Sequence, residues 1–560
     1  MNCGILQGPI LSKSIMSFTS KYQHIGALIL FFSLFIGLYR PLLAVKGFSP
    51  KDDFVEMVLV SSTSLLPQIQ TWAEPYSSLG HILNHDIEAN GRFRPAYWIL
   101  NYAEAHLLVP HARLWQFETL LIGTITVWLF YLACRRLTCS FLPAIWGGLW
   151  FMLSGCRLWK EKQTAEEPGL LILLIALNMI IYTGHSAKPS RWDWAALVLL
   201  VLAGLMKESF VMIIPAVVGL RLILRWYALN FTDATEDTNR SIWQVLNSFR
   251  WYIAVGIAVT ALMVFPIFYV YHLNGYGHRI AGDINTNRLA DINAWWALVQ
   301  EARGKLLDFG PLLTLVVGIR YLRTPKHRLL FVLGMALCIM WVGPQMFLYL
   351  RSGFVGYYIF PAALALIFLS SLGLEWIHRS MPHVVFLAVY GLCIAPLMYY
   401  TLTASWMEIQ TFAGTTEAFQ GVVDATTTHV DDNHAILVVL PDAWWGREIS
   451  LLVELGRAHI QSPVYMTYEG AIGSLIEGQG IDKIYKPFSL ADVDQIDMII
   501  SYQAADQFRA YAAQNFVWFD EDDWTGQTIT GDFRLLSWKN TFGVGSINTL
   551  RSIKYSIFYR

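Results

Sequence analysis

Long apolar stretches separated by short polar segments fill the first 400 residues of the chain. A transmembrane helix needs about 20 apolar residues, because the hydrocarbon core of a bilayer is about 30 Å thick. Two of the candidate stretches, 193–206 and 307–320, are short for a full crossing. The pattern predicts a multi-pass α-helical membrane domain of about 11 spans, at 24–45, 114–134, 140–156, 168–184, 193–206, 209–224, 251–273, 307–320, 329–350, 357–374 and 383–403.

The pattern changes after residue 404, where short apolar strands alternate with helical stretches. Strands are expected at 434–440, 463–468 and 498–502, and helices at 446–458, 470–477 and 504–514. Such alternation is typical of a small α/β domain with a largely parallel sheet. The expected parts are therefore an N-terminal segment, 1–23, a transmembrane catalytic domain, 24–404, and a small extracytoplasmic α/β domain, 405–560.

Composition supports a membrane protein and narrows its class. Of the 560 residues, 55% are hydrophobic and only 14% are charged, whereas soluble domains carry about 25% charged residues. The net charge of -1 gives no reason to expect a nucleic-acid partner. The six cysteines all precede residue 400 and lack the spacing of a metal site or of a disulfide framework.

Lysine and arginine in short loops set the expected orientation, because such loops stay on the cytoplasmic side. A cytoplasmic N-terminus places these basic residues inside: Lys13, Lys21, Arg135, Arg136, Lys188, Arg191, Arg221, Arg225, Arg240, Arg250, Arg320, Arg323, Lys326, Arg328 and Arg379. The first long loop, 46–113, and the tail then lie outside. Outer segments without usable glycosylation sequons, and a tail without cysteine, favour a bacterial inner membrane with a periplasmic tail.

The first outer loop, 46–113, is far longer than most connections, and loops of that length are usually functional or disordered. Asp52 and Asp53 begin it, directly after the first span. A carboxylate at the edge of a membrane cavity is able to take a proton from an acceptor hydroxyl. The alternative is an ordinary solvated pair beside Lys51.

Basic and histidine residues follow in the same loop. Arg92 and Arg94 have the planar guanidinium groups that bind phosphate bidentately. The alternative is that they pair with lipid headgroups or with Asp86 and Glu88. His81 and His85 are four residues apart, but no third ligand motif accompanies them, so a metal site is not predicted.

Two charged pairs occur in later outer segments. Glu166 and Glu167 are candidates to orient an acceptor or an ion, or else belong to a solvated turn. Lys207 and Glu208 interrupt an apolar stretch, and ionisable residues at such depth indicate a functional site. The alternative for this second pair is a tight outer hairpin whose ends reach water.

A further basic residue, Arg351, stands between two strong spans and is followed by Tyr357, Tyr358 and Pro361. An arginine with nearby tyrosines at the outer face suits a lipid phosphate. Snorkelling of the arginine to the headgroups is the alternative.

In their order and topology these landmarks resemble the GT-C superfamily of membrane glycosyltransferases, which includes protein O-mannosyltransferases and bacterial lipid A aminoarabinose transferases. In that superfamily the first outer loop opens with an acidic pair, which Asp52-Asp53 matches, and a later Arg/Pro stretch corresponds to 91–98. Many members also have a Lys-Glu pair after the fifth span, which Lys207-Glu208 matches, and an Arg–Tyr–Pro cluster in a late span, which corresponds to Arg351 to Pro361. The resemblance covers about residues 24–400. The stretch reads Arg-Phe-Arg-Pro rather than the His-Pro-Pro of protein mannosyltransferases, which argues against a protein acceptor.

The resemblance implies an inverting transfer of a sugar from a polyprenyl-phosphate donor to a hydroxyl of a glycan, lipid or protein acceptor on the outer side of the membrane. It makes Asp52 or Asp53 the general base. Arg92, Arg94, Lys207 and Arg351 are the donor-phosphate candidates, and the substrate-binding candidates are Glu166, Glu167, Glu208, Tyr357 and Tyr358. No cofactor is required, and a divalent metal held by the paired carboxylates is left open. The alternatives are a transporter or flippase of a lipid-linked or anionic substrate and a non-catalytic scaffold for the tail.

Overall fold

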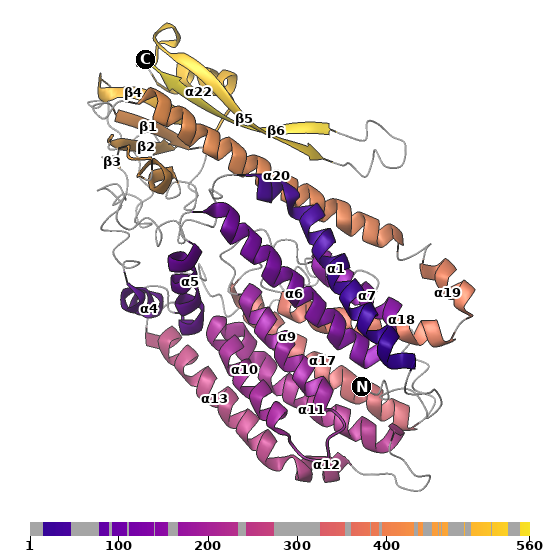
Figure 1. Ribbon diagram of the computed structural model, residues 1–560. Helices are drawn as coiled ribbons and strands as arrows, with labels where there is room; N and C mark the ends of the chain where they lie inside the picture. The colour runs from indigo at the N-terminus through magenta and orange to yellow at the C-terminus, as the bar shows by residue number, and fades with distance from the viewer. Residues whose placement is uncertain are drawn as a thin grey trace.

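The computed structural model describes most of the helical region and much of the tail (Figure 1). The described residues are 15–45, 78–88, 92–108, 111–138, 140–154, 166–232, 242–273, 325–352, 360–380, 382–390, 395–430, 435–440, 451–456, 458–460, 462–468, 486–487, 494–516, 518–535 and 549–560. Asp52, Asp53, Tyr357 and Tyr358 lie outside these ranges. The side chains of Glu166 and Arg351 are outside the description too, although both residues belong to helices.

A bundle of helices forms the larger part of the molecule (Figure 1). In chain order these are α1 (Ile15–Ala44), α6 (Ala112–Thr138), α7 (Phe141–Ser154), α9 (Glu166–Thr183), α10 (Arg191–Met206), α11 (Ile214–Tyr227), α12 (Ile242–Ser248), α13 (Arg250–Leu273), α17 (Pro325–Ser352), α18 (Phe360–Ser380) and α19 (His383–Val389). Two shorter helices, α4 (Leu79–Glu88) and α5 (Pro95–Leu108), come from the first long loop.

Five segments of the described chain are long and apolar enough to cross a membrane: Tyr22–Ala44, Ala112–Thr138, Glu208–Phe231, Arg250–Ile267 and Arg328–Gln345. Each overlaps one of the expected spans. Shorter apolar helices at Phe141–Ser154, Glu167–Thr183 and Leu364–Glu375 match three more, and the expected span at 307–320 lies outside the described residues. The chain is therefore a helical membrane protein with at least these five candidate spans.

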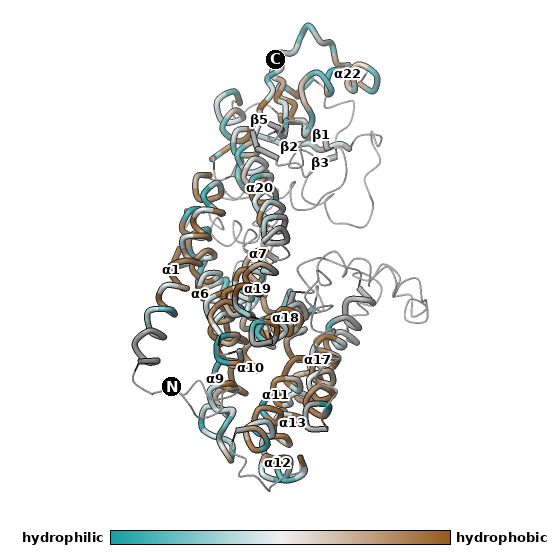
Figure 2. The backbone as a smooth tube through the Cα atoms, turned by 90° about the vertical axis from the view of Figure 1, so that its right-hand side faces the viewer, coloured by the Kyte–Doolittle hydropathy of each residue, from teal (hydrophilic) through white to brown (hydrophobic). Residues whose placement is uncertain are grey.

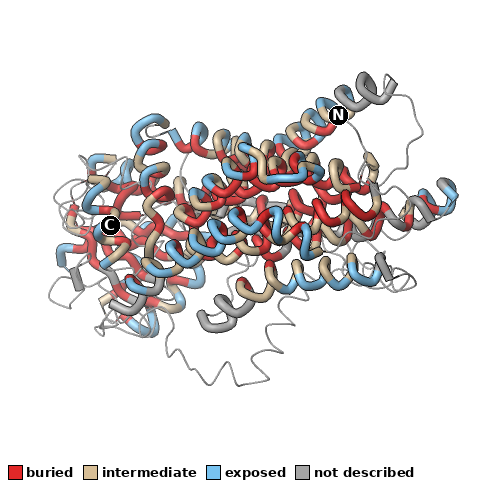
Figure 3. The backbone as a smooth tube through the Cα atoms, turned by 90° about the horizontal axis from the view of Figure 1, so that it is seen from below, coloured by how far each residue is buried: buried red, intermediate tan, exposed pale blue. Residues whose placement is uncertain are grey.

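The bundle has a buried aromatic centre and an apolar outer surface. Phe130 of α6 stacks on Phe151 of α7 with ring centroids 4.7 Å apart and lies 4.4 Å from Phe368 of α18. Buried residues run along the middle of the molecule (Figure 3). On α13, by contrast, Leu262 and Phe265 are each 71% exposed. Large exposed apolar side chains on a long helix are typical of a lipid-facing surface, and the bundle is strongly hydrophobic in Figure 2.

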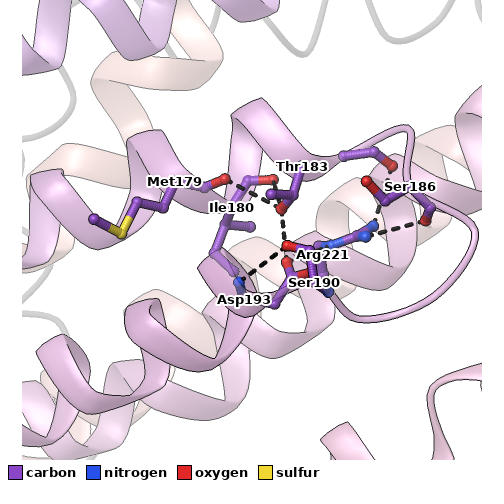
Figure 4. Close-up of polar contacts among 8 residues, drawn as sticks. Met179, Ile180, Thr183, Ser186, Ser190, Asp193 and Arg221 are labelled. Atoms are coloured by element: carbon purple, nitrogen blue, oxygen red, sulfur yellow. Dashed lines mark hydrogen bonds and ion pairs between the residues drawn. The ribbon is translucent and has the colours of Figure 1, made fainter.

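The helices α10 and α11 form an antiparallel hairpin whose base is a buried ion pair (Figure 4). Arg221 Nε donates to Asp193 Oδ1 at 2.7 Å, and both side chains are fully buried. The Arg221 guanidinium also donates to the carbonyls of Gly184 and Ser186, each at 3.1 Å. Asp193 Oδ2 accepts from the backbone N–H of Ser190 at 2.6 Å as part of a capping box that begins α10. One arginine thus ties the start of α10, the middle of α11 and the α9–α10 turn together.

We expect Arg221→Met to destabilise the protein by about 3–5 kcal/mol, because it leaves the Asp193 carboxylate buried without its cation. The measurement is thermal unfolding of the purified protein in detergent. Arg191→Met is the matched control, since Arg191 is exposed at the start of the same hairpin. Equal melting temperatures for the two variants would contradict this assignment.

The long helix α20 (Ala395–His429) joins the bundle to a sheet at the other end of the molecule (Figure 1). It runs through the expected domain boundary at residue 404 without a break. A Cβ atom at Gly531 of the sheet would collide with the carbonyl oxygen of Gly414, and one at Gly421 would lie 2.7 Å from Ile529. Small residues on both elements therefore let α20 lie directly on the sheet.

The sheet has six described strands in the order β3-β2-β1-β4-β6-β5. They are β1 (Ala435–Leu440), β2 (Val464–Tyr468), β3 (Lys486–Pro487), β4 (Ile496–Ser501), β5 (Thr525–Leu535) and β6 (Thr549–Tyr559). The strands β3, β2, β1 and β4 pair in parallel, whereas β6 pairs antiparallel with both β4 and β5. The expected strands at 434–440, 463–468 and 498–502 and the helix at 504–514, which is α22 (Ala505–Asn515), are confirmed. The helix expected at 446–458 is present over 451–456, and that at 470–477 lies outside the described residues.

Alternate residues of β1 point to opposite faces of the sheet and pack in two different cores, as the two-residue period of a strand requires. Ile436 and Val438 join a cluster that contains residues of α20, whereas Leu437 and Val439 join one that contains Phe508 of α22. The sheet is thus covered on both faces, by α20 on one and α22 on the other.

Candidate functional site

One apolar cluster links the first-loop helices, the tip of the hairpin and the tail. It contains Tyr97 and Trp98 of α5, Trp115 of α6 and Met206 at the end of α10. The same cluster includes Phe419 of α20 and the face of the sheet that α20 covers. The first long loop, the end of α10 and the tail therefore meet at one end of the bundle, where Figure 1 shows α4 and α5. The sequence also placed these three segments on a common side of the membrane.

The backbone leaves the helical conformation at Lys207, and this residue forms the tip of the hairpin. Lys207 ends α10 in an extended conformation, with φ -148 and ψ 126, and a 3₁₀ helix follows over Glu208–Ile213. Asp193, at the base, is 13 residues before Met206, which is about 20 Å at 1.5 Å per residue. A hairpin is present, but the alternative that its ends merely reach water is wrong for Lys207, which is only 7% exposed.

Arg94 is the best-defined charged group at this end of the bundle. It is 9% exposed, and its Nη2 and Nε donate to the two carboxylate oxygens of Asp86 at 2.9 and 3.3 Å. Its guanidinium carbon lies 5.0 Å from the ring centroid of Tyr97 and 5.7 Å from that of Trp98. The predicted alternative that Arg94 pairs with Asp86 is confirmed, and this pair is buried rather than solvated.

The first loop is also bonded to the hairpin tip. The backbone N–H of Phe93 donates to Glu208 Oε1 at 3.2 Å, across 115 positions of sequence. Burial by itself lowers the pKa of Arg94, but the negative charges of Asp86 and Glu208 outweigh that effect and raise the pKa above its ordinary value. Arg94 therefore stays charged at any working pH. Its Nη1 group donates to no acceptor among the described residues.

A later helix, α17, reaches the same tip. Gln345 is fully buried, and its side-chain amide donates to the backbone carbonyl of Ser209, next to Glu208. Among the described atoms, Gln345 Oε1 and Ser209 Oγ have no hydrogen-bond partner. Arg351 follows Gln345 by six residues on the same helix, about 9 Å along its axis. The contact with Ser209 thus brings the segment that carries Arg351 toward the tip.

The start of α9 borders the tip on another side. Glu167 is 1% exposed in its first turn. Two residues later, a Cβ on Gly169 would lie 3.0 Å from the ring of Phe210, which belongs to the 3₁₀ helix after Lys207. The expected solvated turn is therefore wrong for Glu167, because its carboxylate is buried near the hairpin tip.

Comparison with known proteins finds similarity among solved structures only. No family model and no curated protein matches the chain. It is similar to ArnT from Cupriavidus metallidurans bound to undecaprenyl phosphate, at 12% identity over 95% of this chain and 98% of that one, with a TM-score of 0.46. It is also similar to the apo oligosaccharyltransferase of Archaeoglobus fulgidus, at 10% identity over 91% and 74%, with a TM-score of 0.41. Because scores this low do not establish a shared fold, function has to be inferred from the residues of the site.

Of the predicted site residues that the structure describes, Arg94, Lys207, Glu208 and Glu167 all lie around the hairpin tip. Arg92 is half-buried beside Arg94, and its backbone N–H donates to the carbonyl of Asp86 at 2.9 Å. No three metal-binding side chains gather anywhere in the described part of the chain.

Sequence reasoning missed two residues of this region. Asp86 was considered as an alternative partner for the arginines but not as a residue of the site, and Gln345 was not considered. Asp86 had a usable signal, because Ile82 lies one turn before it and a residue at that spacing shares its helix face. Gln345 had none, since a lone amide in an apolar span is compatible with many environments.

Proposed function

We propose that this chain is a membrane glycosyltransferase that moves a sugar from a polyprenyl-phosphate donor to an acceptor hydroxyl. The hydrogen bond from the Phe93 N–H to Glu208 carries the proposal, because it joins two motifs of the GT-C resemblance that are far apart in sequence. Gln345 adds the helix that bears a third motif. A chance likeness of short motifs gives no reason for them to meet at one hairpin tip.

The groups at the tip suit a phosphate that carries negative charge as it leaves. Arg94 is held in place with Nη1 available, and Lys207 lies on the adjacent element. Preorganised donors directed at developing charge are usually the largest contribution to catalysis. In the proposed reaction these two cations bind the donor phosphate, together with Arg351 and Arg92.

The bond changes follow from this arrangement. The acceptor oxygen attacks the anomeric carbon, and its proton passes to the carboxylate of Asp52 or Asp53. The bond between the anomeric carbon and the phosphate oxygen breaks, and the phosphate keeps the electron pair. Attack opposite the leaving group inverts the configuration of the sugar. Glu166, Glu167, Tyr357 and Tyr358 are the proposed contacts to the substrates.

The position of the tail suggests where the acceptor arrives. Since the sheet and α20 share an apolar cluster with α5, the tail stands at the same end of the bundle as Arg94. In the proposed orientation that end faces the periplasm of a bacterial inner membrane and the N-terminus is cytoplasmic. The tail then presents or selects a glycan, lipid or protein acceptor.

Transfer in detergent tests this function against the transporter alternative. The purified full chain, a polyprenyl-phosphate sugar pool and an acceptor extract from a host lacking the protein should yield free polyprenyl phosphate and a glycosylated acceptor. Sugar transfer does not need a sealed compartment, so it can be measured in detergent micelles. Movement of the donor across sealed vesicles, with no turnover in micelles, would instead identify a flippase.

A further inference from the structure

Asp86 fixes two parts of the first loop at once. Its carboxylate holds the Arg94 guanidinium through both oxygens, and its backbone carbonyl accepts from the N–H of Arg92. The side chain is 2% exposed, and α4, which carries it, is anchored by the buried Ile82. Burying a carboxylate to this extent raises the free energy of the folded state unless its oxygens accept hydrogen bonds or pair with a cation.

The Arg94 guanidinium is confined on more than one side. Asp86 occupies Nε and Nη2, while the guanidinium carbon lies over the rings of Tyr97 and Trp98. Glu208 is a second carboxylate close enough to act on its charge, but its Oε1 accepts from the backbone of Phe93. Among the described residues, Glu208 is the carboxylate besides Asp86 whose charge acts on Arg94. Without Asp86, the guanidinium would be able to pair with Glu208, and Nη1 would no longer be held where a ligand phosphate should bind.

We infer that Asp86 is a positioning residue for anion binding, which holds Arg94 by two of its nitrogens so that Nη1 faces the phosphate of a polyprenyl-phosphate ligand. This role rests on the proposed function of the site. Asp86 attenuates the charge of Arg94 but removes its freedom to rotate. A preorganised donor loses less conformational entropy when the ligand binds.

A double-mutant cycle tests the inference on the full chain in detergent, with a polyprenyl monophosphate as the probe. The variants are Asp86→Asn, Arg94→Gln and the two combined, with Glu88→Gln as control because Glu88 is an exposed acid on the same helix. For each variant we measure the dissociation constant for the probe and the melting temperature of the protein. The combined variant replaces the ion pair by two neutral amides, which guards against simple failure to fold.

Arg94→Gln should weaken binding by about tenfold to a hundredfold, the usual range for a hydrogen bond to a charged group. Asp86→Asn should weaken it by about fivefold or more, whereas Glu88→Gln should leave it unchanged. In the Arg94→Gln background, Asp86→Asn should have no further effect on binding. The combined variant should regain the wild-type melting temperature without regaining affinity.

Three results would overturn the inference. Wild-type or tighter binding by Asp86→Asn would mean that Asp86 only competes with the ligand for Arg94. Wild-type binding by the combined variant would make the pair purely structural. If the wild-type protein does not bind the probe, the proposed function falls together with the inference. If Arg94→Gln alone weakens binding, the proposed function stands and only the role of Asp86 is lost.

Discussion

Replacing Asp52 and Asp53 by asparagine, one at a time, should abolish sugar transfer in at least one variant while the protein still folds and binds its donor. Asparagine has nearly the same shape as aspartate but does not accept the proton of the acceptor hydroxyl. A general base contributes about 10²–10⁴-fold to a rate, so the loss should fall in that range. The measurement is the rate of acceptor glycosylation by purified protein, at saturating donor.

Glu88→Gln is the control for this pair too, since it removes an exposed carboxylate from the same loop. It should retain full activity. If both single asparagine variants keep the wild-type rate, the base is not in this pair. If both lose donor binding instead, the carboxylates hold the substrate or an ion and the proposed proton transfer is wrong.

Replacing Arg94 by glutamine should lower kcat/KM for transfer by about 10²–10³-fold, the usual effect of removing one donor from a site of developing negative charge. Arg94→Lys should recover only part of this loss, because lysine keeps the charge but lacks the planar guanidinium, which donates to Asp86 and to the phosphate at the same time. Kinetics over a range of donor concentrations, with each variant's melting temperature, separate loss of catalysis from loss of fold.

Arg113→Gln is the matched control, because Arg113 is an exposed arginine at the start of α6. It should transfer sugar at the wild-type rate. Full activity in Arg94→Gln would show that the buried pair with Asp86 is only a structural contact. The proposed phosphate binding at the hairpin tip would then rest on Lys207, Arg351 and Arg92.

Much of the helical region was predictable from sequence because apolar periodicity and length decide whether a segment crosses a membrane. The break at Lys207 was predictable for the same reason, since two adjacent charges interrupt an apolar stretch. The central strands β1 and β4 are short apolar runs, Ala435–Leu440 and Ile496–Ser501, and such runs identify buried parallel strands.

The antiparallel strands β5 and β6 were missed because much of β5 consists of exposed threonine and glutamine with little apolar character. The length of α20 was missed as well. Beyond residue 404 the helix carries many polar residues, but its apolar side, which includes Phe419 and Val422, packs on the sheet, where Gly414 and Gly421 allow close contact. Both features depend on packing against segments that are distant in sequence.

The site was predictable as a set of motifs but not as a set of contacts. Outer placement and shared chemistry suggested that the first loop and Lys207-Glu208 meet, and the Phe93–Glu208 hydrogen bond confirms that they do. Asp86 was an alternative partner of Arg94 in the sequence, but the sequence left open whether that pair is solvated or buried, since the Ile82–Asp86 spacing puts Asp86 on the apolar face of α4 without showing what covers it. Only the packing of α4 against α5 decides between these outcomes.

The central claim is that carboxylates of the first loop and cations around the hairpin tip act on one substrate. An experimental structure of the protein with a bound polyprenyl phosphate tests it most directly. The account predicts the phosphate within hydrogen-bond distance of Arg94 Nη1 and near Lys207, with a carboxylate of Asp52 or Asp53 facing the position of the sugar. A phosphate bound elsewhere, or the two aspartates at the opposite end of the bundle beside Asp193 and Arg221, would contradict it.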